Sequence, residues 1–197
     1  MTTFGSDLWS GVRTVGVHID RHPSVKELCE LLDLDPMPLE GGMFRRTWAG
    51  PEDATGRPAG SAIVVLLASG DAEMFSAMHR LPGDEVWHFY VGDPLEMLLL
   101  RPDGSADTLT LGPDLLGGQQ VQVTVPGGTW MGASVVEGGN WSLFGCTMAP
   151  GFVAADYEGG DADELAAAYP QAAARIRRLC RPGEPLRHPE GSEGGLL

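Results

Sequence analysis

Hydrophobic and polar positions along the middle of the chain follow patterns that are typical of short β-strands. The run from 62 to 68 is continuously apolar, as expected of a strand that is buried on both faces. Residues 120–125 alternate strictly, with valine at every second position and Gln or Thr between. Further strand-like segments at 86–91, 95–100 and 141–148 are bounded by turns rich in Gly and Pro. Short strands without intervening helices predict an antiparallel sandwich or barrel.

Helical patterns flank this strand-rich region on both sides. Ser24 and Glu27 have the spacing of a capping box, in which each side chain bonds the other residue's backbone N–H. Beyond residue 151 the chain becomes rich in Ala, and Pro170 suits the first turn of a helix. We therefore expect helices at 24–32, 163–169 and 171–180, with a first strand at 45–49.

The length of 197 residues indicates a single domain with extensions. We expect an N-terminal extension over 1–23 and one domain over 24–180 that includes the flanking helices. Residues 181–197 are rich in Gly, Pro and Glu, which predicts a flexible tail. No apolar run approaches the ~18–20 residues that span a bilayer, so we expect no membrane segment.

Charge and cysteine content narrow the possible partners and the compartment. Thirteen basic and 27 acidic side chains give a net charge of −14, which disfavours nucleic acid and anionic membranes as partners. The three cysteines are widely spaced and lack a metal-ligand pattern, which favours a reducing compartment over a disulfide scaffold. Residues 1–16 also lack the pattern of a signal peptide. We therefore expect a soluble cytoplasmic protein.

Residues 79–92 carry a spaced set of His79, Glu85 and Gly92 that resembles the first cupin motif. Pro126-Gly127-Gly128 resembles the Pro-x-Gly turn of the second cupin motif. Together with Leu39-Glu40-Gly41-Gly42 and with Ala149-Pro150-Gly151-Phe152, the series is similar to the cupin-5 family over roughly residues 25–179.

This resemblance implies an all-β fold, a jelly-roll type antiparallel β-barrel with a short N-terminal helix and C-terminal helices. Members of the family are similar in fold to deoxysugar-nucleotide epimerases and to plant storage proteins. A fold shared by such different proteins specifies little about the reaction.

The residues at the expected metal-ligand positions depart from those of metal-binding cupins. Leu81 and Met131 stand where histidines would be, so His79 and Glu85 alone remain of the four usual ligands. A catalytic metal site normally has about three protein ligands. His88 should not replace them, because side chains alternate along a strand and His88 falls on the face opposite Glu85. We therefore expect no metal and no other cofactor.

His79 is the expected catalytic base, because histidine titrates near neutral pH and the matched position projects into the barrel pocket. Epimerases of this fold use a barrel histidine in that role. Glu85 is expected to orient the imidazole and to stabilise its charge. The alternatives remain open: His79 as a hydrogen-bonded residue of the barrel wall, and Glu85 as an ion-pair partner of Arg80 or Arg45.

Seven further residues are candidates for substrate binding, each with a structural alternative. The two tryptophans suit the wall of a ligand site or ordinary core packing. The polar stripe on the strand at 120–125 faces either the pocket or the solvent, because the alternation alone does not say which face is inside. An arginine on the first strand could bind a carboxylate or phosphate, or lie on the surface. The candidates are Arg45, Thr47, Trp87, Gln122, Thr124, Trp130 and Met131.

The sequence as a whole favours a metal-independent enzyme that acts on a small polar or cyclic metabolite by acid–base chemistry. An isomerase, epimerase, cyclase or lyase would use such chemistry. The alternatives are a non-catalytic protein that binds a sugar or another metabolite, and a metal-dependent oxygenase-like cupin. We also expect a homodimer, because the strand face with Val86, His88 and Tyr90 is too apolar to remain in contact with water.

Overall fold

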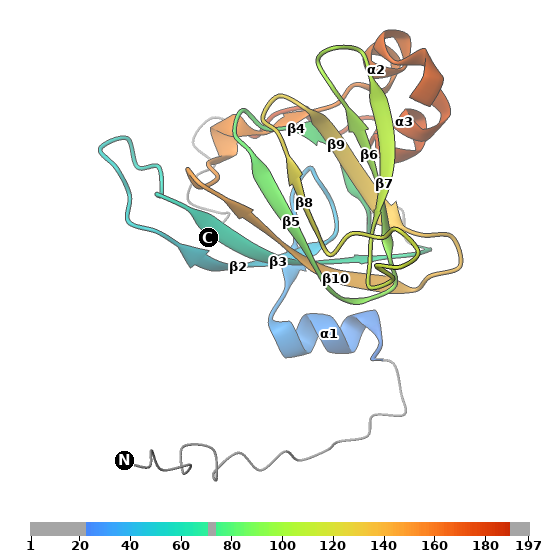
Figure 1. Ribbon diagram of the computed structural model, residues 1–197. Helices are drawn as coiled ribbons and strands as arrows, with labels where there is room; N and C mark the ends of the chain where they lie inside the picture. The colour runs from blue at the N-terminus through green and yellow to red at the C-terminus, as the bar shows by residue number, and fades with distance from the viewer. Residues whose placement is uncertain (1–22, 71–73, 190–197) are drawn as a thin grey trace, which may run out of the picture.

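The computed structural model describes residues 23–70 and 74–189, and within these residues two antiparallel sheets face each other (Figure 1). One sheet has six strands in the order β1-β2-β3-β10-β5-β8, and the other has five in the order β11-β4-β9-β6-β7. The strands are β1 (Asp35–Pro36), β2 (Met43–Ala49), β3 (Ser61–Ala68), β4 (Ser76–Arg80), β5 (Glu85–Gly92), β6 (Leu95–Leu100), β7 (Ala106–Leu111), β8 (Gln122–Val125), β9 (Trp130–Val135), β10 (Trp141–Met148) and β11 (Glu158–Gly159). This arrangement confirms the predicted all-β antiparallel barrel.

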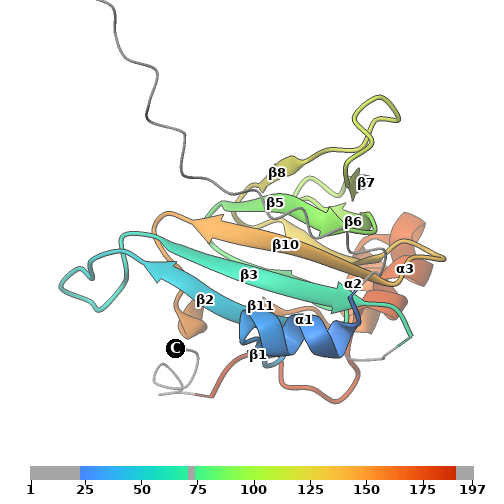
Figure 2. The same ribbon diagram turned by 90° about the horizontal axis from the view of Figure 1, so that it is seen from below.

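The first helix, α1 (Val25–Leu32), begins at the predicted capping box. The Ser24 hydroxyl accepts a hydrogen bond from the Glu27 N–H at 3.3 Å, and the Glu27 carboxylate accepts one from the Ser24 N–H at 2.9 Å. Leu28 is buried against Leu66 and its neighbours on the outer face of the six-stranded sheet. Figure 2 shows α1 lying across this face. The predicted N-terminal helix is therefore confirmed.

The apolar runs of β3 and β6 are explained by packing on both faces of the sheets. In β3, Val65 and Leu67 point into the core between the sheets, whereas Leu66 packs under α1. In β6, Leu99 points into the same core, and Leu98 packs outward against the C-terminal helices. Each run is apolar on both faces because one face packs against the opposite sheet and the other face packs against helices.

Two short helices, α2 (Ala162–Ala168) and α3 (Ala173–Leu179), cover the outer face of the five-stranded sheet. Pro170 begins a separate 3₁₀ turn, η2 (Pro170–Ala172), so the helix predicted at 171–180 begins later than expected, at Ala173. A further 3₁₀ turn, η1 (Ala154–Asp156), precedes β11. None of the helices in the described residues has the length and apolar character needed to cross a membrane.

The described part of the predicted tail, 181–189, packs along β11. The Gly159 N–H donates to the Leu186 carbonyl at 2.8 Å, and Arg187 lies 3.2 Å from the Glu158 carboxylate. The remaining tail, 190–197, and nearly all of the expected N-terminal extension, 1–22, lie outside the described residues.

Candidate functional site

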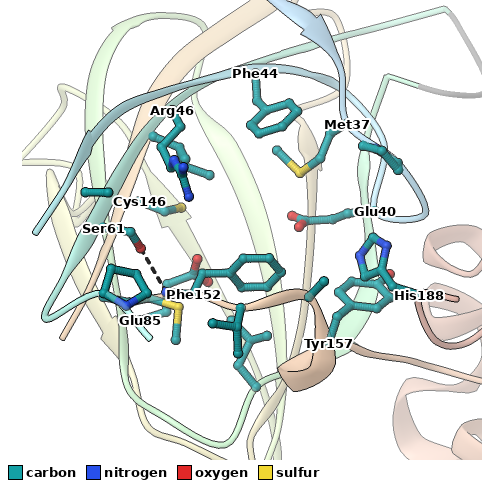
Figure 3. Close-up of a pocket in the computed structure, with 18 of the residues that line it drawn as sticks. Met37, Glu40, Phe44, Arg46, Ser61, Glu85, Cys146, Phe152, Tyr157 and His188 are labelled. Carbon is teal, nitrogen blue, oxygen red and sulfur yellow. Dashed lines mark hydrogen bonds between the residues drawn. The ribbon is translucent and has the colours of Figure 1, made fainter. Parts of the chain in front are cut away.

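A cavity of about 420 Å³ opens between the six-stranded sheet and the segments that follow β10 (Figure 3). This volume lies in the range of ~300–1,000 Å³ that is usual for small-molecule sites. We call this cavity the pocket. Its apolar walls include Met37, Phe44, Ile63, Leu81, Met148 and Phe152, and its polar lining includes Glu40, Arg46, Glu52, Ser61, Glu85, Cys146, Tyr157 and His188.

Glu85 is the first residue of β5 and contributes a buried carboxyl group to the pocket wall. The Trp87 indole N–H donates to one carboxyl oxygen at 2.8 Å, and the Cys146 thiol is a second hydrogen-bond partner. Burial raises the pKa of Glu85 to about 7, with a smaller upward effect from Glu40. The group therefore exchanges between acid and carboxylate near neutral pH, as a general acid or base must.

His79 lies in β4 and is almost completely buried beside the pocket. Its Nδ1 is 2.8 Å from the Ala77 carbonyl oxygen, which only accepts hydrogen bonds, so this nitrogen carries a proton. Its Nε2 is 3.9 Å from the Glu40 carboxylate. The ring stacks on Tyr157 with 5.5 Å between centroids. His79 thus contacts the Glu40 and Tyr157 side chains, both of which line the pocket.

A tight turn after β1 brings Glu40 to the pocket. The Gly41 N–H donates to the Met37 carbonyl at 3.1 Å, and Leu39 adopts a positive φ of 62° within this turn. The Ser76 hydroxyl holds the Glu40 carboxylate at 2.8 Å. The carboxylate is therefore held near the pocket by the Ser76 hydroxyl and lies close to His79.

Arg46 points into the pocket from β2, as Figure 3 shows. It alternates along the strand with Phe44, which lines the same wall, whereas the side chain of Arg45 is exposed. Beyond Arg46 the pairing of β2 with β3 shifts register, so the simple alternation ends there. The arginine that lines the pocket is therefore Arg46, one position after the predicted Arg45.

An ion pair fixes the rim of the pocket after β10. Arg57 binds the Asp156 carboxylate through its two terminal guanidinium nitrogens, Nη1 and Nη2, at 2.5 and 2.9 Å. On the same side, the Phe152 N–H donates to the Ser61 hydroxyl at 3.0 Å. Two sequence-distant segments are thereby joined, and Phe152 is held over the cavity.

Of the predicted site residues, the structure brings His79, Glu85 and Trp87 together. Trp87 is buried in the core, where it stacks on Phe144 with 4.7 Å between centroids. It therefore contacts the Glu85 carboxyl group and does not form a pocket wall.

The other six predicted binding residues lie away from the pocket lining. Trp130 packs outside the five-stranded sheet, under the Arg80 guanidinium at 4.6 Å. Met131 is enclosed in the core between the sheets. The remaining four side chains are exposed, because valine occupies the inner face of β8 and Phe44 and Arg46 occupy the inner face of β2; they are Arg45, Thr47, Gln122 and Thr124.

The donor set does not fit a metal centre. Within the described residues, no three His, Cys, Asp or Glu side chains are grouped so that they could hold a metal ion. Leu81 lines the pocket and Met131 is buried where cupin ligands would be expected. One Glu85 oxygen is already bonded to Trp87, and one His79 nitrogen is bonded to the backbone. We therefore derive no chemistry through a metal.

Sequence reasoning missed most of the polar and aromatic groups that line the pocket, and five of them illustrate why. Arg46 lies two positions after Phe44, so both side chains share one face of β2. The sequence could have indicated Arg46 as a pocket residue only if that face were known to be the inner one. Glu40 and Phe152 lie within motif segments that carry the family resemblance, but that resemblance gives them no role. Tyr157 and His188 lie outside those segments. The five residues are Glu40, Arg46, Phe152, Tyr157 and His188.

Residues 26–159 match the family described as Cupin_5, Cupin superfamily (DUF985). A solved structure of a protein from Shewanella oneidensis is 33% identical with a TM-score of 0.74, and the match covers 82% of this chain and 99% of that one. A hypothetical protein from Leishmania major is 29% identical with a TM-score of 0.70, covering 80% and 99%. No curated protein matches.

Proposed function

Because the chain belongs to the cupin-5 family, in which the fold leaves the reaction open, we propose a function from the chemistry of its pocket. The proposed function is metal-independent acid–base catalysis on a small polar or cyclic metabolite, as an isomerase, epimerase, cyclase or lyase. The observation that carries it is the buried Glu85 carboxyl in the pocket wall, whose pKa is raised to about 7.

In the proposed reaction, the Glu85 carboxylate takes a proton from a carbon next to a carbonyl group. The C–H electron pair moves into that carbonyl, which becomes an enol or enolate. The Tyr157 hydroxyl lines the pocket without a hydrogen bond to another described residue, and it suits donation to the developing oxygen charge. Glu85 then returns the proton to the same or another carbon, so the reaction needs no external oxidant or reductant.

We assign His79 a positioning role in this reaction. The electrostatic interaction with His79 lowers the pKa of Glu85, against the effect of burial, and the His79 ring contacts both Glu40 and Tyr157. The sequence favoured the reverse assignment, with His79 as base and Glu85 as its orienter. The buried position of His79 beside the pocket, and the position of Glu85 on its lining, support the assignment proposed here.

The experiment is solvent-deuterium exchange into a panel of small cyclic ketones and 2-oxo acids, followed by NMR. Glu85→Gln should slow exchange by roughly 10²–10⁴, the usual contribution of a positioned acid–base group. His79→Gln should slow exchange less and should shift its pH midpoint upward, because the electrostatic interaction that lowers the pKa of Glu85 is removed.

Glu137→Gln is the matched control, since Glu137 is exposed and lies outside the pocket lining. A greater loss in His79→Gln than in Glu85→Gln would return the role of base to His79. Absence of exchange across the panel, combined with tight binding, would favour the second candidate function. That candidate is a non-catalytic metabolite-binding cupin, which the largely apolar walls also support.

We also propose that the protein works as a homodimer in the cytoplasm. Tyr90 and Val91 of β5 and Val121, which directly precedes β8, are exposed, and such apolar patches usually mark interfaces. All three cysteines are free thiols, which suits a reducing compartment.

A further inference from the structure

Arg46 stands out among the arginines because it lines the pocket and has no ion-pair or hydrogen-bond partner among the described residues. Elsewhere in the described residues, most arginines contact a carboxylate or a backbone carbonyl, as the pairs Arg57–Asp156 and Arg80–Glu158 illustrate. Neither Arg45, Arg46 nor Arg178 makes such a contact, and of these three Arg46 alone lines the pocket. A half-buried guanidinium with five N–H donors therefore faces the cavity without an acceptor.

The carboxyl groups that share the pocket do not neutralise Arg46. Glu40, Glu52 and Glu85 all line the cavity, yet none forms an ion pair with it in the described part of the chain. Glu40 is held by Ser76 and His79, and the Glu85 carboxyl is bonded to Trp87. The unmatched positive charge is thus left for a ligand.

We propose that the ligand of the pocket is a small monocarboxylate, with its carboxylate bound by Arg46 and its apolar body between Phe44 and Phe152. Guanidinium and carboxylate match as paired parallel hydrogen bonds, which gives both affinity and orientation. The aromatic side chains suit a ring or a short hydrocarbon skeleton. This inference rests on the proposed function in taking the pocket as the site of ligand binding.

A single negative charge fits the pocket better than a phosphate dianion. One guanidinium faces the cavity, and three carboxyl groups line it. A second negative charge on the ligand would therefore meet repulsion from these carboxyl groups, and no second Arg and no Lys lines the cavity among the described residues to offset it. With its carboxylate on Arg46, a small ligand would direct its other carbons toward Glu85, where the proposed proton transfer takes place.

The test measures binding rather than turnover. Benzoate, cyclohexanecarboxylate and phenylpyruvate, the amides of these three acids, and phenyl phosphate are titrated at pH 6 by ligand-observed NMR. At least one carboxylate should bind at least tenfold more tightly than its amide and than phenyl phosphate. Arg46→Met should abolish that preference, whereas Arg45→Met, the adjacent exposed arginine, should retain it. Thermal unfolding of both variants checks that the fold is intact.

Three results would overturn the inference: equal binding of acid and amide, a preference that survives Arg46→Met, or no carboxylate binding at millimolar concentration. The same titrations with Glu85→Gln separate this inference from the proposed function. If the wild-type protein binds carboxylates selectively, retains this selectivity in Glu85→Gln and catalyses no exchange, the result supports the ligand class and contradicts the proposed catalysis. Exchange that proceeds equally in wild type and Arg46→Met would contradict the ligand class alone.

Discussion

The Glu85 carboxyl group links the chemistry of the pocket to the stability of the protein. In the folded protein burial raises its pKa to about 7, from a usual value of 4.5. The unfolded chain therefore loses this proton at lower pH than the folded protein does. As pH rises from about 4.5 to 7, unfolding becomes more favourable, and the total effect is about 3 kcal/mol. Above pH 7 the effect is complete.

We therefore predict that Glu85→Gln stabilises the protein at pH 8 and has little effect at pH 4.5. The amide keeps the Trp87 hydrogen bond but carries no charge that must be buried. The gain in unfolding free energy at pH 8 should be on the order of 2–3 kcal/mol. Urea unfolding at both pH values measures it, with Glu137→Gln as the control. A variant that is equally destabilised at both pH values would contradict a raised pKa for Glu85.

At the scale of secondary structure, the pattern of the sequence predicts most strands but not the direction of their side chains. The alternation in β8 marks two faces, and the structure assigns its valines to the core and Gln122 and Thr124 to the surface. In β2 the same ambiguity makes Arg45 the predicted ligand-binding arginine, whereas Arg46 lines the pocket. A period of two identifies a strand, whereas the inner face depends on the packing of the whole sheet.

Residues that reach the pocket from turns and from the chain end are harder still to predict. Glu40, Tyr157 and His188 lie outside the long strands, and their places depend on long-range contacts. The motif series does carry His79 and Glu85, because their spacing is local. Sequence reasoning thus finds groups whose role a motif already assigns, whereas it misses groups such as Glu40, which lies in a motif segment but reaches the pocket only through tertiary contacts.

The segment after α3 is held to β11 through Glu158. Its carboxylate binds Arg80 in a bidentate contact, with both distances 2.9 Å, and also lies 3.2 Å from Arg187. We predict that Glu158→Gln loosens this segment and speeds hydrogen exchange of the Gly159 amide about fivefold, because exposed pairs of this kind contribute about 1 kcal/mol. Hydrogen-exchange NMR of Gly159 measures the change.

Asp107→Asn is the control for this exchange experiment. Asp107 lies on β7, and the change removes its exposed ion pair with Arg101 while β11 stays intact. Unchanged exchange at Gly159 in Glu158→Gln would mean that the backbone hydrogen bond to Leu186 alone holds the segment.

For the whole molecule, the cover of the six-stranded sheet is uneven. α1 packs over β3, whereas Tyr90 and Val121 at the β5–β8 edge are 53% and 46% exposed. We predict a dimer through this edge at micromolar concentration. Val121→Glu should raise the dimer dissociation constant at least tenfold, as measured by sedimentation equilibrium.

Leu31→Glu, on the exposed side of α1, is the control for this change and should leave the dimer unaffected. A wild-type protein that sediments as a monomer at micromolar concentration would contradict the predicted dimer.

The pocket draws its walls from nearly the full described length of the chain, from Met37 to His188. During synthesis, the strands that carry Phe44 and Glu85 leave the ribosome well before the segment that carries His188. The cavity therefore cannot close around a ligand until translation of the domain is almost finished. We therefore expect a metabolite that binds there to stabilise the folded domain only after the segment with His188 has packed against the strands.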